Sequence, residues 1–249
     1  MKKLFIQYFL FAASFVILFL YFISCASCNS NNVTNITPQV KPDTLKKGII
    51  NRTAALQAIE NAKPLLADGE LITRSDDDYE SLTLQNFLKR DRSFSHCGIV
   101  FKEDSTFWVY HIITGAENPG GQVRRDAFDT FVNPSMKTGF GIFKYNLHGK
   151  EVEKFHAIFK KNYADKIPFD VTFNFKSDDS LYCSEMIFKA LKKASNGKII
   201  IPTSALANFK PKIFGFKHNS TFFKHFEYVG IDDLYLNPFC TELIRVKYK

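Results

Sequence analysis

The chain has 249 residues and a formal net charge of +8, with 45% hydrophobic and 15% aromatic side chains. Its basic residues are spread along 150–166 and 189–217, which gives little support to nucleic-acid binding. The five cysteines have no spacing that indicates a disulfide scaffold, so the fold must depend on an ordinary hydrophobic core.

Residues 1–24 have the layout of an export signal, with two lysines before a nearly unbroken apolar run from Leu4 to Ile23. The stretch FISC resembles a lipoprotein processing site, in which Ser24 precedes a cysteine, Cys25, that becomes lipidated. An uncleaved membrane anchor is the alternative, because about 20 apolar residues can span a bilayer. Both interpretations predict a protein of the cell envelope, anchored in a membrane and facing the periplasm or the exterior.

Residues 25–49 are predicted to be a flexible tether, because this segment is polar, rich in Asn and Thr, and poor in large apolar side chains. Residues 50–249 are long enough to form one domain with a substantial core. Removing the two N-terminal lysines lowers the formal net charge from +8 to +6. That charge suits a solvated surface, with attraction to anionic headgroups or an acidic wall polymer as the alternative.

Hydrophobic periodicity predicts a helix over 52–63 with Asn51 as its N-cap, and the segment DGELIT predicts a turn leading into a short strand. Two β-rich runs, 96–101 and 107–113, are separated by the polar turn KEDST and predict an antiparallel hairpin. Residues 139–145 predict a further strand.

A second helix is predicted over 149–164, where Val152, Phe155, Phe159 and Tyr163 form one apolar stripe. A third begins at Cys183 and ends before Asn196 and Gly197, and the segments FEYVGI and TELIRVKY predict late strands. This order of elements predicts an α+β fold in which an antiparallel sheet packs against helices.

The stretch LYCSE places a thiol at the start of the third helix. A cysteine attacks carbonyls as its thiolate, which the positive end of a helix and a nearby imidazolium both stabilise. First-turn N–H groups, which have no partner within the helix, can hold a developing oxyanion. Cys183 is therefore a candidate nucleophile, with a small buried core residue as the alternative, and we interpret Glu185, in the same turn, mainly as a stabiliser of the helix start.

Two of the six histidines, His96 and His111, lie in the predicted hairpin. If Val100 faces Phe107 across the turn, His96 lies directly opposite His111, so that one ring can orient the other. A register shift of one residue would separate the rings onto opposite faces. The pairing is therefore a hypothesis about register.

Structural interpretations compete with these roles. Cysteine is often a small buried apolar residue, which is how we interpret Cys97, since it points away from His96. A zinc site formed by His96, His111 and Cys183 is chemically reasonable, but no close-spaced ligand pair supports it. The other four histidines are expected on the surface: His148, His156, His218 and His225.

The strand SHCGIVF, followed later by LYCSE at a helix start, resembles the YiiX-like group of permuted papain-fold amidases. These are relatives of the NlpC cell-wall peptidases and distant relatives of lecithin:retinol acyltransferase. The similarity runs from Asp68 to Ala194, and the histidine strand precedes the cysteine helix, as it does in the permuted group. It implies a papain-like fold with Cys183 as nucleophile, His96 as general base and acid, and His111 as the third, orienting residue.

Two features depart from that group. Its members often have an acidic residue near the position of His111, and their usual Gly-Asp pair before the first core strand is Gly69-Glu70 in this chain. Residues 198–249 have no counterpart in the resemblance.

These observations predict a membrane-tethered cysteine hydrolase that cleaves an amide bond of a cell-wall peptide or an acyl bond of a lipid. We expect it to be a monomer that uses no cofactor and no metal. A non-catalytic module that binds wall peptide or lipid, and a lipid acyltransferase, are the alternatives.

Overall fold

The computed structural model describes residues 42–248, apart from 136 and 210–222. The predicted export signal with Cys25, and the tether up to residue 41, lie outside the described residues. The chain divides into two compact units, Met1–Thr44 and Leu45–Lys249, and the fold described below is that of the second. Among the residues that the structure describes, no helix combines the length and the apolar character needed to cross a bilayer.

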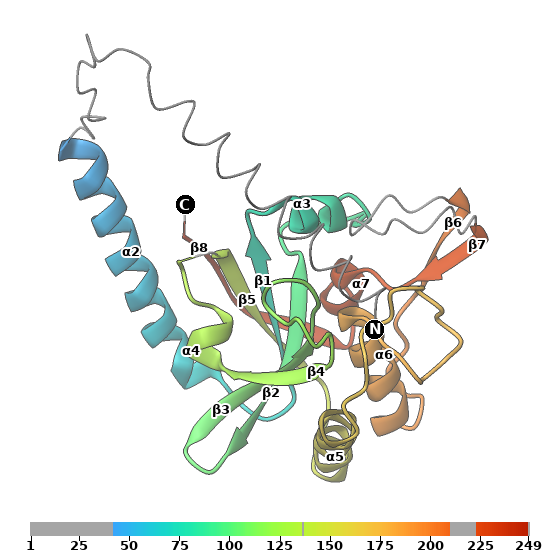
Figure 1. Cartoon of the computed structure of the whole chain (residues 1–249). Helices are drawn as coiled ribbons and strands as arrows, with labels where there is room; N and C mark the ends of the chain where they lie inside the picture. The colour runs from blue at the N-terminus through green and yellow to red at the C-terminus, as the bar shows by residue number, and fades with distance from the viewer. Residues whose placement is uncertain (1–41, 136, 210–222, 249) are drawn as a thin grey trace, which may run out of the picture. The chain divides into compact units, whose positions relative to one another are not determined.

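The central element is a six-stranded sheet in which every neighbouring pair is antiparallel (Figure 1). In spatial order its strands are β4 (Val123–Ala127), β3 (Thr106–Ile112), β2 (His96–Glu103), β1 (Glu70–Asp76), β5 (Lys137–Tyr145) and β8 (Cys240–Lys247). A separate two-stranded sheet pairs β6 (Ser204–Phe209) with β7 (Phe223–Tyr228).

Helices cover both faces of the six-stranded sheet. They are α2 (Pro42–Ala62), a 3-10 turn (Lys63–Leu65), α3 (Tyr79–Gln85), α4 (Phe128–Phe131), α5 (Lys150–Ala164), α6 (Cys183–Ala194) and α7 (Ile231–Tyr235). Alternate residues of β2 face opposite sides, so Cys97 and Ile99 pack in the core that includes α5 and α6. Val100 packs in a second core, which includes residues of α2 and α4.

The predicted α+β fold is confirmed. The turn before β1 has Gly69 at φ +86°, and α6 ends where Asn196 and Gly197 both take positive φ, as the residue types indicate. The buried stripe of α5 contains Phe155 and Phe159.

Two predicted boundaries are wrong. Helix α2 begins at Pro42, so Asn51 lies inside the helix and does not cap it, and residues 42–49 of the predicted tether are helical. The predicted strand FEYVGI ends at Tyr228, and Ile231 already starts α7. The sequence patterns did not predict β4, β6, α3, α4, α7 or the 3-10 turn.

Candidate active site

Cys183 is the first residue of α6, as the sequence predicts. Tyr182 before it is extended, with φ −101° and ψ 170°, and its backbone N–H donates to the Glu185 carboxylate at 3.2 Å. The hydroxyl of Ser184 donates to the Val229 carbonyl at 2.8 Å. These bonds hold the first turn of α6 in place, and Glu185 has the helix-stabilising role expected of it.

Cys183 is buried, with 8% of the residue exposed, and its thiol lies against a second thiol, that of Cys97. A hydrogen bond from Cys97 lowers the pKa of Cys183, burial opposes this effect, and the backbone N–H of Ser184 adds to it. Burial and the neighbouring sulfur raise the pKa of Cys97, which therefore stays a thiol and donates. Cys97 is a buried core residue as predicted, but it also contacts the candidate nucleophile.

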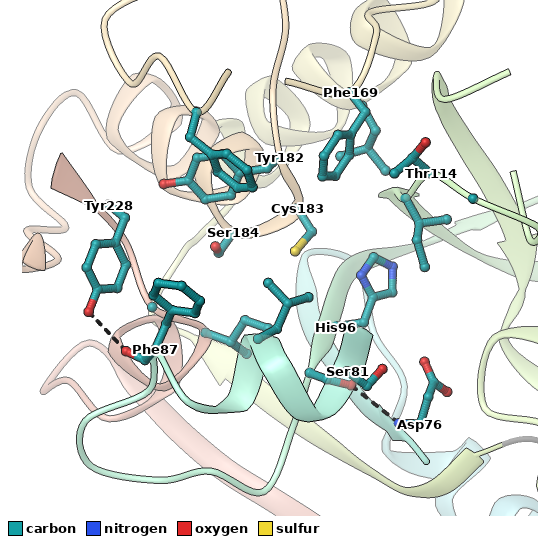
Figure 2. Close-up of a pocket in the computed structure, with 18 of the residues that line it drawn as sticks. Asp76, Ser81, Phe87, His96, Thr114, Phe169, Tyr182, Cys183, Ser184 and Tyr228 are labelled. Carbon is teal, nitrogen blue, oxygen red and sulfur yellow. Dashed lines mark hydrogen bonds between the residues drawn. The ribbon is translucent and has the colours of Figure 1, made fainter. Parts of the chain in front are cut away.

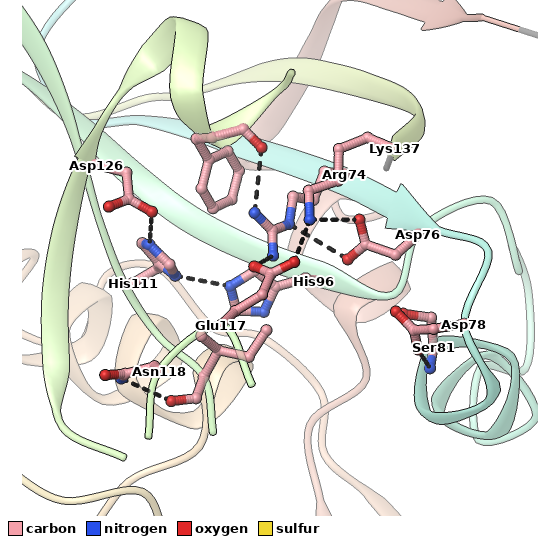
Figure 3. Close-up of polar contacts among 12 residues, drawn as sticks. Arg74, Asp76, Asp78, Ser81, His96, His111, Glu117, Asn118, Asp126 and Lys137 are labelled. Atoms are coloured by element: carbon pink, nitrogen blue, oxygen red, sulfur yellow. Dashed lines mark hydrogen bonds and ion pairs between the residues drawn. The ribbon is translucent and has the colours of Figure 1, made fainter. Parts of the chain in front are cut away.

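His96 and His111 are joined directly, with His96 Nε2 2.9 Å from His111 Nδ1 (Figure 3). The predicted register is wrong, because Val100 pairs with Val109 and not with Phe107. The shift is two residues, which keeps both histidines on one face of the sheet. Their rings therefore still meet, as diagonal neighbours across the two strands.

The second ring nitrogen of His111 is hydrogen-bonded to a carboxylate. His111 Nε2 lies 3.0 Å from an oxygen of Asp126 on β4, and Arg124 donates to the other oxygen of the same carboxylate through Nε at 3.1 Å. The carboxylate of Asp126 is thus the third group in a series of hydrogen bonds that runs from His96 through His111. Sequence reasoning missed it because β4, with two arginines and an aspartate in VRRDA, shows no strand-like alternation.

Both histidines are buried and neutral. Burial, together with the charge on Arg74, holds the pKa of His96 well below its ordinary value. Burial lowers the pKa of His111 to about 4, although its hydrogen bond to Asp126 acts in the opposite direction. Burial acts to raise the pKa of Asp126, but the hydrogen bonds and charges of His111 and Arg124 together outweigh it, so that the pKa falls to about 2. The imidazolium that we expected beside Cys183 is therefore not the favoured state of His96.

A group of four buried or half-buried charges borders the histidine pair (Figure 3). Arg74, which pairs with His96 across β1 and β2, donates to Glu117 at 2.6 Å and to the Phe131 carbonyl at 3.2 Å. Lys137 forms ion pairs with Glu117 and, at 3.0 Å, with Asp76. Two cations and two anions balance, but the cations lie close enough to His96 to disfavour its protonation.

Cys183 and His96 line one cavity of about 540 Å³ (Figure 2). His96 is the first residue of β2, so its ring lies at the end of the sheet, where the cavity reaches it. Most of the wall is apolar and includes Leu84, Phe87, Leu88, Ile112, Phe169, Phe173, Tyr182, Phe226, Tyr228 and Ile231. The carboxylates on it are those of Asp76, Asp78 and Glu117.

The remaining histidines have no part in this cavity within the described residues. His148 is exposed, as expected. The side chain of His156 is only 23% exposed, because its ring stacks on Phe101 at 4.2 Å and bonds to Glu103 at 2.8 Å. The prediction of a surface position is thus wrong for His156, and the side chains of His218 and His225 are not described.

No family model matches the chain, and no curated protein matches it. Among solved structures, the crystal structure of the metalloprotein YiiX from Escherichia coli O157:H7 matches with a TM-score of 0.55 at 16% sequence identity. The match covers 73% of this chain and 98% of that chain. The chain therefore has a YiiX-like fold, in agreement with the fold that the sequence predicts.

The word metalloprotein describes YiiX and raises the question of whether this chain's site fits a metal ion. His111 has no nitrogen to offer, because one bonds to His96 and the other to Asp126. Over residues 42–248 with their gaps, no three His, Cys, Asp or Glu side chains are grouped as ligands. The residues at Cys183 and His96 therefore do not fit a metal centre.

Proposed function

We propose that the protein is a cysteine hydrolase in which Cys183 is the nucleophile and His96 the general base and acid. His111 orients the ring of His96 through the hydrogen bond between His111 Nδ1 and His96 Nε2. One observation carries the proposal: a thiol with a lowered pKa at a helix N-terminus shares a cavity with a neutral imidazole.

The reaction follows from these positions. His96 takes the proton of the Cys183 thiol, the sulfur bonds to the substrate's carbonyl carbon, and the oxyanion is held by N–H groups of the first turn of α6. The tetrahedral adduct collapses to a thioester, and the leaving amine or alcohol takes its proton from His96. Water, deprotonated by His96, then attacks the thioester and releases the acid and the free thiol.

The cavity favours an apolar acyl group over a charged wall peptide. Its volume of about 540 Å³ is within the range of small-molecule sites. A wall peptide would bring carboxylates and amides against aromatic rings, where unpaired polar groups are costly. No Lys or Arg is present on the part of the wall that the structure describes, so peptide carboxylates would lack a cation there. Of the two bonds predicted from the sequence, the lipid acyl bond is therefore the better candidate.

The first test is covalent labelling of the full-length protein with a thiol-directed fatty-acyl probe, read by peptide mass spectrometry. We expect one adduct, at Cys183, which is lost in Cys183→Ala and greatly slowed in His96→Gln. Cys240→Ala is the matched control, since this half-buried thiol is not among the cavity residues, and it should label at Cys183 like the wild type.

Substrates are then compared as hydrolysis of a long-chain p-nitrophenyl ester, a fatty-acyl amide and purified wall fragments. Turnover of the acyl compounds but not of the fragments supports the proposal. Slow labelling of Cys183 that does not depend on His96 would contradict it and favour a binding module. Transfer of the acyl group to an added alcohol, in preference to water, would identify an acyltransferase.

Membrane tethering through residues 1–24 and lipidation of Cys25 remain part of the proposal, and both lie outside the described residues. The support is the apolar run and the FISC stretch. If Cys25→Ala leaves fatty-acid incorporation and membrane association unchanged, the lipoprotein part of the proposal is wrong.

A further inference from the structure

The hydrogen bonds of the two histidines form one continuous chain that ends at a carboxylate. His96 Nε2 bonds to His111 Nδ1 at 2.9 Å, and His111 Nε2 bonds to Asp126 at 3.0 Å. The His111 side chain is fully buried and that of Asp126 is 12% exposed. Within the described residues, His96 Nδ1 has no hydrogen-bond partner, and the His96 ring borders the cavity that also holds Cys183.

We propose that Asp126 is a positioning residue that selects which nitrogen of His96 acts as the base, through the ring of His111. The inference rests on the proposed function for its catalytic meaning. Its structural content, the position of two protons, is measurable without turnover.

The selection follows from counting donors and acceptors. Asp126 is ionised and can only accept, so His111 must carry its proton on Nε2. A neutral imidazole has one N–H, so His111 Nδ1 is an acceptor. The partner nitrogen, His96 Nε2, must then carry the proton of His96. His96 Nδ1 is left unprotonated, as a general base in the cavity that also holds Cys183 requires.

The contacts of Arg124 determine how the amide of an Asp126→Asn variant would be oriented. Its Nε and Nη2 both donate to one oxygen of Asp126, at 3.1 and 2.5 Å, while His111 bonds to the other oxygen. Arginine is only a donor, so in Asp126→Asn the amide oxygen must face Arg124. The amide NH2 then faces His111 Nε2, which has to become the acceptor.

That change reverses the direction of every hydrogen bond between position 126 and His96. His111 carries its proton on Nδ1, His96 Nε2 has to accept, and the His96 proton moves to Nδ1, the nitrogen that served as the base. We therefore expect Asp126→Asn to lower the rate of acylation of Cys183 by about 10²-fold, the contribution of a general base, with little change in substrate affinity.

The decisive measurement is nitrogen NMR of the full-length protein with labelled histidine, because ring N–H and unprotonated nitrogens have different shifts. Spectra of His96→Gln and His111→Gln assign the signals. In the wild type we expect both rings protonated at Nε2, and in Asp126→Asn both protonated at Nδ1.

Removing Arg124 provides a rescue that a merely structural role would not show. In Asp126→Asn with Arg124→Leu, the amide can rotate and present its oxygen to His111, which restores the wild-type proton positions and raises the acylation rate. Arg124→Leu alone should leave both rings as in the wild type. Asp91→Asn is the matched control, since Asp91 also has its pKa lowered to about 2 and pairs with Arg245, away from the histidines.

A proton on Nδ1 of His96 in the wild type would overturn the inference, as would rings unchanged in Asp126→Asn. If Cys183 proves unreactive while both rings carry their protons on the expected nitrogens, the proposed function fails and the role of Asp126 in placing the protons stands. If Cys183 is reactive and Asp126→Asn reacts as fast as the wild type, the inference fails and the proposed function stands.

Discussion

Two sulfur atoms lie in contact where α6 begins, and their pKa values shift in opposite directions. Burial raises the pKa of Cys97, while the hydrogen bond from Cys97 lowers the pKa of Cys183. The second thiol therefore acts as an uncharged donor to the first. A thiol donor takes over part of the role that an imidazolium was expected to have, because His96 is kept neutral by burial and by the charge of Arg74.

Replacing Cys97 by alanine should raise the pKa of Cys183, because the thiolate loses its sulfur donor and keeps its burial. The pH dependence of alkylation at Cys183, followed by peptide mass spectrometry, reports that pKa. Cys240→Ala is the control and should leave the profile in place. An unchanged profile in Cys97→Ala would show that the donor has no influence on the thiolate.

At the scale of elements, the hairpin of β2 and β3 brings the histidines together, and its glycine permits the approach. A Cβ at Gly98 would lie 2.6 Å from a methyl of Val109, 2.8 Å from the Tyr110 carbonyl and 3.0 Å from Cβ of His111. These atoms belong to the strand that carries His111, so a side chain at position 98 would push the strand away.

Gly98→Ala should therefore destabilise the fold by roughly 2 kcal/mol, the usual cost of overpacking. It should also slow acylation of Cys183 in the molecules that remain folded. Denaturant unfolding measures the first effect and probe labelling under native conditions the second. Gly120→Ala is the control, because the nearest atom to its added Cβ is Asn118 Oδ1 at 4.0 Å. Equal stability of the two variants would contradict the tight approach.

Hydrogen bonds between α7 and the segment that follows α3 hold one wall of the cavity in place. The buried carboxylate of Asp232 in α7 accepts from the backbone N–H groups of Lys89 at 3.0 Å and Arg90 at 2.8 Å. These residues directly follow Phe87 and Leu88, which line the cavity. A contact between segments about 140 positions apart thus positions the apolar wall.

For the molecule as a whole, the buried histidines link stability to pH. His111 has a pKa of about 4 when folded and an ordinary value of 6.5, so the unfolded chain binds the extra proton between these values. Its contribution, about 3 kcal/mol, is complete above pH 6.5 and is lost as the pH falls towards 4. Burial raises the pKa of Glu70 and Glu185 to about 7, and these two groups act in the opposite direction.

His111→Gln isolates this contribution. Glutamine can accept from His96 and donate to Asp126 but does not titrate, so the free energy of unfolding should rise less steeply from pH 4 to 6.5 than in the wild type. Urea unfolding at several pH values gives the slope of the unfolding free energy against pH for each protein. The contributions of Glu70 and Glu185 are common to both proteins and cancel in the difference between the slopes. His148→Gln, at an exposed position, should retain the wild-type slope; equal slopes in wild type and His111→Gln would contradict the linkage.

The register of the hairpin shows where local pattern stops being sufficient. The predicted hairpin register places both histidines on one face, and the observed register keeps them there. The opposed pair was wrong because the pairing of Glu103 with Thr106 leaves a two-residue loop, with Asp104 at φ +54°. Loop length fixes register, and the polar turn KEDST does not reveal how many of its residues continue the strands.

Periodicity, caps and turn residues act over a few positions, and they were enough to predict the α+β class and the helix that starts at Cys183. The contacts of the candidate site residues follow only from the packing of the whole domain. Asp126 behind His111, Cys97 beside Cys183 and the apolar cavity over both are contacts between distant segments. Their geometry depends on strand order and packing, and no local pattern encodes either.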